Sequence, residues 1–396
     1  MRNKFLKYQA QTTNNPIGLE ISYAKGSYIY DIKNKKYLDF VAGVSASSLG
    51  HRNKIISKAV IKQIKKYWHV MVYGEFIQEP TVNLCELLSK NLPKSLSNTY
   101  LTNSGTEAIE AAMKLAKRVT GRTEIIAAKN SYHGSTQGSM SIMGLEERKR
   151  GYRPLLPDIK FIEFNNENDI KKISEKTAAV VLETIQGGAG FIIPKKNYLK
   201  KLKNRCKKLK TLLILDEIQS GIGRTGKLFS YEHYNIVPDI LVYGKGLGGG
   251  FPVGAISTSK KNMSLFKENP ILGHITTFGG HPVIAAAAYA NLKETLNSKI
   301  MNKIDEKEKL FKKNLKHPLI NEIRGRGLML ALILKDKEVA NNLVIKCLEK
   351  GLILFYLLFE SKAVRITPPL TIKKNEIKLG CQIIINTLNQ MDNSVH

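Results

Sequence analysis

The chain has 396 residues, of which 43% are hydrophobic and 24% charged. This balance is typical of a globular protein with a sizeable core and excludes a disordered or fibrous chain. The net charge of +29 raises nucleic acid as a partner, but the basic residues are scattered along the whole chain and form no single stripe. We therefore predict no binding of nucleic acid.

Cysteine spacing and the length of the apolar runs predict the cellular compartment of the protein. The first 16 residues lack the apolar segment of a signal peptide, and the longest apolar run, residues 352–359, is too short to cross a bilayer. We therefore predict a cytoplasmic protein without a membrane partner. No Cys-x-x-Cys pair occurs, so we expect neither a metal site nor a redox pair among Cys85, Cys206, Cys347 and Cys381.

The N-terminal half begins with a strand-like stretch over residues 27–40 and an amphipathic stretch over 54–67. From about residue 98 to residue 253, short apolar runs alternate with longer amphipathic segments. This alternation predicts a mostly parallel sheet flanked by helices, that is, an α/β fold. The strand-like runs are NTYLTNSG, EIIAAK, AAVVLETI, TLLILDEI, DILVYGKG and GAIST, and the helical segments are AIEAAMKLAKRV and YLKKLKNRCKKL.

The C-terminal region begins with a long helical pattern from about residue 281. The strand-like segments LMLALIL and AVRITPP and two more helical segments follow. We expect this region to form a smaller α+β domain together with the N-terminal arm. The predicted division is a large domain over residues 52–282 and a small domain made of residues 1–51 and 283–396.

Two glycine-rich segments resemble nucleotide-binding loops but lack the context that such loops require. GIGRTGKL, residues 221–228, has the GxxxxGK spacing of a P-loop, yet Leu228 stands where a magnesium-binding hydroxyl is needed, and DEIQS separates the segment from its strand. YGKGLGGG, residues 243–250, matches GxGxxG, but Phe-Pro and another strand follow where a helix should begin. The distinctive group of this second segment is Lys245, a lone cation at a strand end.

Polar and charged side chains gather where the predicted strands end. Because the carboxyl ends of parallel strands face one crevice, these groups are expected to share a pocket. The candidates are Ser104, Gly105 and Thr106, then Tyr132, then Glu183, then Asp216 and Gln219, and finally Lys245.

The segment SGTE predicts a helix N-terminus that can hold a phosphate. Ser104 stands at the N-cap and Glu107 three residues later, which is the spacing of a capping box. Gly105 leaves backbone N–H groups accessible at the positive end of the helix, where a phosphate binds readily. A helix cap without a ligand is the alternative for this motif taken alone.

A phosphate seat, an aromatic residue, a carboxylate and a lysine in one pocket indicate pyridoxal 5'-phosphate (PLP). Asp216 would keep the pyridine nitrogen protonated, because a neighbouring carboxylate favours the cation. Lys245 would form a Schiff base with the aldehyde, give way to the substrate amine and then act as the base. The strand that ends in Asp216 and Glu217 would thus stop at the cation of the cofactor. We interpret His133 as a structural histidine.

With these motifs the chain resembles the class III, or ω-amino acid, aminotransferases of fold type I among PLP enzymes. The resemblance covers nearly the whole length. It implies an aspartate-aminotransferase-like large domain and a smaller α+β domain. The motifs that carry it are YLDFVAGVSASSLGH, NSGTEAIEAAMKLAKRVTGR, SYHG, LILDEIQSGIGRTG, GKGLGGGFPVGA, TTFGGHP and VRITPP.

The resemblance also implies roles for single residues. Tyr132 would stack on one face of the ring, Ile218 would cover the other face, and Gln219 would meet the ring hydroxyl. Thr277 would reach the phosphate of the neighbouring subunit, which implies a homodimer with shared active sites. Arg365 would grip the α-carboxylate of the substrate, a task that suits a guanidinium.

Three positions depart from the pattern of acetylornithine and ornithine aminotransferases. Ser135 stands where these enzymes carry an arginine that helps to bind the carboxylate of the ω-amino donor. Gly188 stands where they carry a glutamate that masks the counterpart of Arg365. Val44 stands where ornithine aminotransferases tend to carry a tyrosine. A valine at this position favours an acylated donor.

The resemblance implies transfer of an amino group between glutamate/2-oxoglutarate and a basic amino acid derivative, most directly N-acetylornithine in arginine synthesis. N-succinyl-diaminopimelate in lysine synthesis is a second donor. Ornithine, 4-aminobutyrate and lysine ε-aminotransferases are alternatives within the class, ahead of an aminomutase or decarboxylase. From other classes, the charge leaves a nucleic-acid-binding protein open, and GIGRTGK leaves a P-loop enzyme open.

Overall fold

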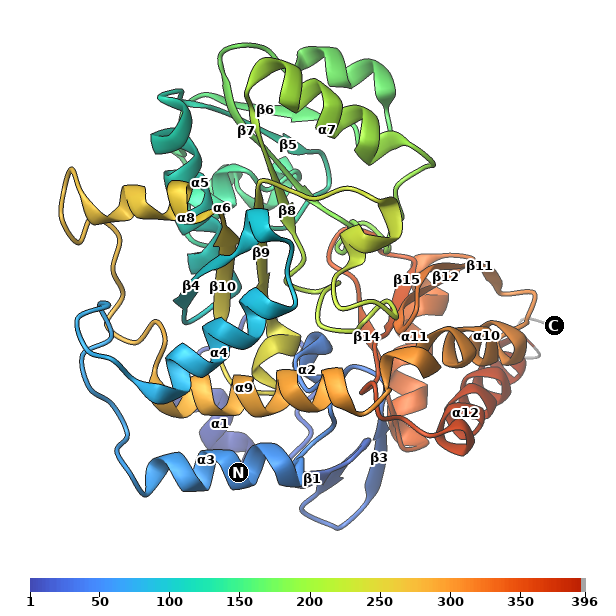
Figure 1. The fold of residues 1–396 in the computed structure, drawn as a ribbon. Helices are drawn as coiled ribbons and strands as arrows, with labels where there is room; N and C mark the ends of the chain where they lie inside the picture. Colours follow the sequence, from blue (N-terminus) through green and yellow to red (C-terminus); the bar gives the residue numbers. More distant parts are fainter. Residues whose placement is uncertain (393–396) are drawn as a thin grey trace.

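The computed structural model describes residues 1–392, and its centre is a seven-stranded sheet (Figure 1). Only β10 runs antiparallel to its neighbours, β4 and β9, while all other pairs are parallel. The predicted α/β fold with a mostly parallel sheet is confirmed, and the edge strand β6 is an addition. The order is β4 (Asn98–Thr102), β10 (Gly254–Thr258), β9 (Ile240–Gly244), β8 (Leu212–Asp216), β7 (Thr177–Glu183), β5 (Glu124–Ala128) and β6 (Ile159–Ile162).

Both faces of this sheet are buried, which explains why its strands read as continuous apolar runs. In β7, Ala179 and Val181 enter one core, whereas Val180 and Leu182 enter the core on the opposite face. The first core is covered by α5 (Gly105–Thr120), whose alanine-rich face is buried. The second is covered by α4 (Glu79–Lys90), α7 (Tyr198–Leu209) and α9 (Pro282–Asn297).

Two smaller sheets lie beside the large one, and one of them joins the N-terminal arm to the C-terminal part of the chain (Figure 1). Strand β13, from the C-terminal part, pairs in parallel with β3 of the N-terminal arm. One sheet consists of β1 (Ile21–Lys25), β2 (Tyr28–Asp31), β3 (Lys36–Asp39) and β13 (Leu352–Ile353). The other consists of β11 (Ile320–Arg326), β12 (Met329–Leu334), β15 (Ala363–Ile366) and β14 (Phe355–Tyr356), with antiparallel pairs throughout.

A separate core supports the predicted small domain. It joins Leu38 and Phe40 of the N-terminal arm to apolar residues between Ile304 and Leu388. Helix α9 begins at the proposed boundary of 282 and packs into the core of the large sheet through Ala285 and Leu292. We retain the division at 52–282 as a proposal.

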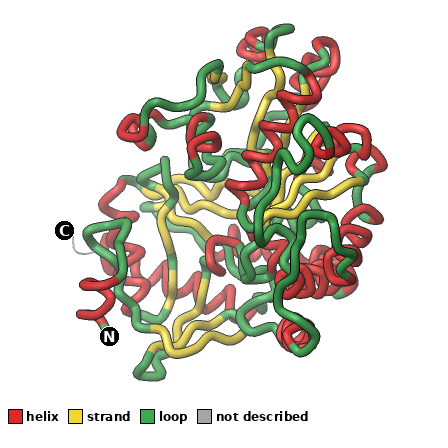
Figure 2. The backbone as a smooth tube through the Cα atoms, turned by 90° about the vertical axis from the view of Figure 1, so that its left-hand side faces the viewer, coloured by secondary structure: helices red, strands yellow, loops and turns green. Residues whose placement is uncertain are grey.

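Helices and turns complete the chain, and Figure 2 shows them around the strands. Among residues 1–392, no helix is long and apolar enough to cross a membrane. The other α-helices are α1 (Arg2–Tyr8), α2 (Ala42–Ser45), α3 (Lys54–Ile64), α6 (Gln137–Ser141), α8 (Lys260–Met263), α10 (Ile304–Asn314), α11 (Lys337–Glu349) and α12 (Lys374–Asp392). The 3₁₀ helices are η1 (Lys94–Leu96), η2 (Glu146–Arg148), η3 (Arg150–Tyr152), η4 (Glu167–Lys172), η5 (Ser230–Tyr234), η6 (Lys245–Gly248), η7 (Ser264–Lys267) and η8 (Met301–Lys303).

Candidate active site

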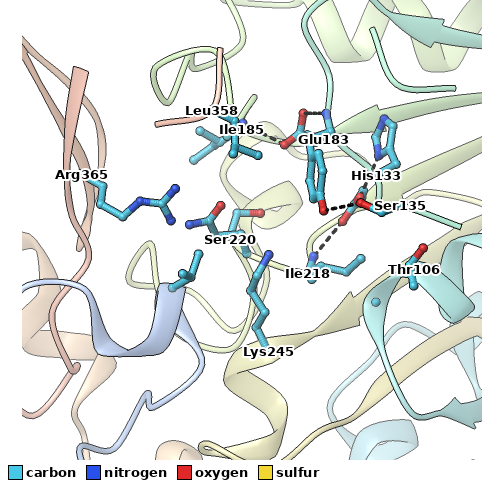
Figure 3. A pocket seen from close by; sticks show the side chains of 18 of the residues that line it. Thr106, His133, Ser135, Glu183, Ile185, Ile218, Ser220, Lys245, Leu358 and Arg365 are labelled. Carbon is cyan, nitrogen blue, oxygen red and sulfur yellow. Dashed lines mark hydrogen bonds and ion pairs between the residues drawn. The ribbon is translucent and has the colours of Figure 1, made fainter. Parts of the chain in front are cut away.

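A cavity of about 510 Å³ lies where the carboxyl ends of the central strands face β14 and β15 (Figure 3). Its volume suits a cofactor with a small substrate. Figure 3 shows Lys245 and Arg365 pointing into it from different elements. Nine of the predicted site residues line this cavity, and they are Gly105, Thr106, Tyr132, Glu183, Asp216, Ile218, Gln219, Lys245 and Arg365. Ser104 and Thr277 do not line it.

Asp216, the last residue of β8, is fixed on both sides by hydrogen bonds. Its Oδ1 accepts from the backbone N–H of Ile218 at 2.9 Å, and its Oδ2 lies 2.8 Å from Nδ1 of His133. Both side chains are buried, and Nε2 of His133 has no partner in the described part of the chain. His133 therefore orients the carboxylate, a more specific role than the structural one that the sequence suggested.

Glu217 does not share the cavity, which corrects the interpretation that both strand-end carboxylates face a cofactor. Its carboxylate accepts from the backbone N–H groups of Ser230 and Tyr231 and from the hydroxyl of Thr184. Successive side chains of a strand point to opposite faces, so Asp216 and Glu217 diverge. Burial raises the pKa of Glu217 to about 7, and its hydrogen bonds partly oppose this shift.

Lys245 follows β9 and begins the short helix η6. Its φ of 38° falls in the left-handed region, where strained residues of functional sites are often found. The amine makes no hydrogen bond or ion pair to any of residues 1–392. Burial lowers the pKa of Lys245; the charge of Asp216 opposes this shift, and that of Arg365 adds to it. A larger neutral fraction makes the amine a better nucleophile and base.

The N-terminus of α5 presents free backbone N–H groups to the cavity. The Ser104 hydroxyl accepts from the N–H of Glu107, as the predicted cap requires. The Glu107 carboxylate, however, accepts from the backbone and side-chain amides of Asn103 and not from Ser104, so the capping box is shifted by one residue. The N–H groups of Gly105 and Thr106 have no partner inside the helix and remain available to an anion.

Ile218 and Gly105 approach each other closely at one wall of the cavity. A Cβ added at Gly105 would lie 2.7 Å from Cδ1 of Ile218, so only glycine fits there without a shift. Tyr132 lines the cavity as well, with its backbone N–H donating to Glu183 and its hydroxyl 3.2 Å from that of Ser135. The site therefore has one aliphatic and one aromatic wall.

Glu183, the last residue of β7, holds the loop that borders the cavity. Its Oε1 accepts from the N–H of Gly187 at 2.9 Å, and its Oε2 accepts from the N–H of Tyr132 at 3.2 Å. Burial raises the pKa of Glu183 to about 7, with Asp216 adding to this shift and His133 opposing it. Gln219, which also borders the cavity, donates to the Ser45 hydroxyl at 3.4 Å.

Arg365, on β15, carries a buried cation without an acidic partner in the described chain. Its Nε donates to the carbonyl of Tyr356 at 3.0 Å, while Nη1 is buried and unpaired. The side chain is 5% exposed, and burial lowers its pKa to about 10, so it stays charged at neutral pH. An unpaired guanidinium directed into a cavity is suited to a carboxylate ligand.

The three departures from the family pattern all lie on the cavity wall. A Cβ at Gly188 would lie 2.8 Å from Cδ2 of Phe359, so the ring occupies the space that a side chain there would need. Ser135 lines the cavity but is exposed, and its hydroxyl lies 3.2 Å from that of Tyr132. Val44 has a φ of 59°, which is strained for a β-branched residue.

Thr277 lies outside this cavity, on the exposed segment between η7 and α9. Neighbouring apolar side chains of that segment are exposed too, including Ile271 and Phe278. The structure therefore does not bring Thr277 together with the other predicted site residues.

The P-loop-like segment has a structural role in this fold. Arg224 is almost fully buried, and its Nη1 donates to the carbonyl of Leu328, which precedes β12. Burial lowers the pKa of Arg224 to about 9. GIGRTG thus connects the large sheet to the C-terminal part of the chain. The backbone N–H groups of Gly223 and Gly226 donate to backbone carbonyls. A P-loop would need such N–H groups to be free for a phosphate.

The residues present fit PLP. A half-buried lysine whose amine has no partner among residues 1–392 can take the aldehyde. A fixed carboxylate can hold a ring cation, and free N–H groups at a helix start can hold a phosphate. The fold and the site together define a PLP-dependent enzyme of fold type I.

Comparison with known proteins agrees with a PLP-dependent enzyme and identifies the family within that class. A model of the family "Aminotransferase class-III" matches residues 8–388. The chain is 37% identical to the acetylornithine aminotransferase of Caldanaerobacter subterraneus, covering 96% of this chain and 97% of the relative. It is 38% identical to the [LysW]-aminoadipate semialdehyde/glutamate semialdehyde transaminase of Sulfolobus acidocaldarius, over 85% and 86%.

Among solved structures, the ornithine aminotransferase of Toxoplasma gondii, which has PLP at partial occupancy in its active site, superposes with a TM-score of 0.92. It is 29% identical and the match covers 99% of this chain and 94% of that one. The protein belongs to the class III aminotransferases, and it is a PLP-dependent transaminase.

Proposed function

We propose that the enzyme exchanges an amino group between glutamate/2-oxoglutarate and N-acetylornithine. Relatives called acetylornithine aminotransferases support this donor, since they match over most of both chains. The [LysW]-aminoadipate semialdehyde transaminases support acceptance of other acylated donors, including N-succinyl-diaminopimelate. Ornithine, 4-aminobutyrate and lysine, through its ε-amine, are the alternative donors. One observation carries the proposal, namely that Lys245, Asp216 and an unpaired Arg365 line one cavity.

Lys245 is the residue that we assign to the cofactor aldehyde and to proton transfer. When bound, PLP supplies an electron sink for the carbon that bears the amine. Once the substrate amine has taken its place, Nζ of Lys245 takes the proton from that carbon. Its lowered pKa supports this role, because a base must be neutral to accept a proton.

Asp216, with His133 behind it, is assigned to the cofactor ring. We assign Asp216 to the cationic ring nitrogen, because it is buried and its carboxylate is fixed at both oxygens. His133 acts through Asp216 as a positioning residue. A misplaced carboxylate would weaken the electron sink on which the reaction depends.

The remaining cofactor contacts surround these two groups. Tyr132 and Ile218 are assigned to the two faces of the ring, and Gln219 and Glu183 to its edge. The phosphate is assigned to the start of α5, at Ser104, Gly105 and Thr106, where Ser104 contributes through the cap and not through the cavity wall.

Arg365 is assigned to the substrate carboxylate next to the reacting carbon. Its buried, unpaired Nη1 supports this role. Gly188 leaves no acid to mask it, so the cation is open to the carboxylate of glutamate.

We also propose a cytoplasmic homodimer in which Thr277 of each chain reaches the phosphate of the other. The exposed position of Thr277 and the exposed apolar side chains Ile271, Leu272, Ile275 and Phe278 around it support such an interface. Separation by size with light scattering tests the assembly.

A panel of half-reactions tests the donor. Each candidate amine is added to the PLP form, and conversion to the pyridoxamine form is followed by absorbance. Glutamate and N-acetylornithine are expected to convert it fastest. Faster conversion by ornithine or 4-aminobutyrate would make that amine the donor in place of N-acetylornithine. If no amine converted the PLP form, the proposed function would be refuted.

A further inference from the structure

The turn between β14 and β15 forms the outer rim of the cavity. Leu358 lines the cavity, and the N–H of Phe359 donates to the carbonyl of Gly188 at 2.9 Å. The Phe359 ring lies 6.4 Å from the ring of Tyr132 between centroids. This rim is therefore held against the large domain at Gly188.

Arg148, the last residue of η2, lies beside this rim with an exposed side chain. Its Nη2 donates to the carbonyl of Leu358 at 3.0 Å, and its Cζ lies 5.7 Å from the centroid of the Phe359 ring. These contacts fix the guanidinium against the turn that borders the cavity, although Arg148 is not itself among the residues that line it. They use one of its five N–H donors and leave the others for a ligand.

Arg148 differs from other arginines near it because it has no acidic partner among residues 1–392. Arg153, five residues on, pairs with Glu146 at 2.6 Å. Arg324, close to Gly190, pairs with Glu322 and lies 4.0 Å from Glu360 of the same turn. A fixed cation that no carboxylate of the chain neutralises is suited to an external anion.

The substrates of the proposed reaction need such a cation. Glutamate carries a second carboxylate far from its reacting carbon, and N-acetylornithine carries its only carboxylate at the far end. Lys245 and Arg365 are the only cations among the residues that line the cavity, and both already have roles. The lining also includes the apolar side chains of Ile185, Phe355 and Leu358, which offer no partner to a carboxylate.

We propose that Arg148 binds the distal carboxylate of the substrate in both half-reactions, held in place by Leu358 and Phe359. The inference rests on the proposed function and adds a specificity-determining residue to it. Glutamate would thus be held between two guanidinium groups, Arg365 next to the reacting carbon and Arg148 at the distal carboxylate. N-acetylornithine, with its single carboxylate, would engage Arg148 alone.

The test compares Arg148→Gln with Arg153→Gln, a matched change of charge on a neighbouring exposed arginine. Half-reactions are followed with glutamate, with N-acetylornithine and with norvaline, which has a side chain of similar length but no distal carboxylate. For Arg148→Gln, we expect the apparent Kd of glutamate and N-acetylornithine to rise on the order of tenfold, as expected for loss of a charged hydrogen bond. Norvaline should be unaffected, and Arg153→Gln should resemble the parent.

Binding of amine-free acids gives a second readout that does not depend on turnover. Glutarate has two carboxylates and butyrate has one, and both are titrated against the PLP form by absorbance. Arg148→Gln should weaken glutarate and leave butyrate unchanged. Equal effects on glutarate and butyrate, or no effect on either glutarate or glutamate, would overturn the role of Arg148. A parent protein that no amine converts would instead refute the proposed function.

Discussion

The imidazole of His133 and the carboxylate of Asp216 form a buried pair, with Nδ1 2.8 Å from Oδ2. They come from different segments, since Asp216 ends β8 and His133 follows β5. This hydrogen bond holds the Asp216 carboxylate in one orientation towards the cavity. A hydrogen bond to a cofactor nitrogen requires such a fixed carboxylate.

Replacement of His133 should lower the affinity for PLP more than it lowers the stability of the fold. For His133→Ala, we expect PLP affinity and the rate of the glutamate half-reaction to fall about tenfold or more, because a charged hydrogen bond is lost. His133→Asn retains a side-chain N–H donor and should recover part of this loss. PLP titration and stopped-flow absorbance measure both effects. Equal behaviour of the two variants would contradict a positioning role.

Gly188 and Phe359 should be coupled in stability. Gly188→Ala places a Cβ 2.8 Å from Cδ2 of Phe359, closer than the two carbons can lie without a shift. We therefore expect a loss of about 1–3 kcal/mol in the free energy of unfolding. Phe359→Ala opens that space, so the added cost of Gly188→Ala should nearly vanish in the double variant. Urea denaturation of all four proteins gives the coupling energy, and strict additivity would show that the ring is not the obstacle.

Arg365→Gln should abolish efficient turnover without loss of the cofactor. The substitution removes the only arginine that lines the cavity, and the Nη1 of this arginine has no partner in the described chain. We therefore expect kcat/KM for glutamate to fall about a hundredfold. The absorbance of bound PLP should remain. If Arg365→Gln kept full kcat/KM for glutamate, the carboxylate would bind elsewhere.

Glu217 should make stability fall as pH rises. Its pKa is raised from 4.5 to about 7 in the folded chain, so the folded state holds a proton that the unfolded state has already released. The contribution is complete below pH 4.5 and is lost as pH rises towards about 7. Glu183 acts in the same direction. Urea denaturation between pH 5 and 8 should show a shallower dependence for Glu217→Gln than for the parent, and an unchanged slope would contradict the shifted pKa.

Much of this site could be predicted because it lies on local patterns. Continuous apolar runs that end in Asp216 or Lys245 identify strands and their carboxyl ends without any partner information. The edge strand β6 was missed because IKFI is short and has a lysine in its centre. Whether Asp216 or Glu217 faces the cavity depends on the register of β8, which composition does not specify.

Contacts between distant segments could not be predicted in the same way. Phe359 fills the space beside Gly188, although 170 positions separate them in the chain, and nothing local to either residue indicates the other. Arg148 is one of many exposed basic residues in a chain of net charge +29, so only its place at the cavity rim distinguishes it. The role of Arg365 was predicted from the family resemblance alone. The fold supports this role because β15 places the Arg365 side chain on the wall of the cavity.

The central claim is that the amine of Lys245 is joined to PLP while Asp216 holds its ring nitrogen. Borohydride reduction of the purified protein, followed by peptide mass mapping, tests it most directly. We predict that the visible absorbance is bleached and that the pyridoxyl group is found on the peptide containing Lys245, whereas Lys245→Ala carries no label and has no activity. A label on another lysine, or full activity of Lys245→Ala, would contradict the claim.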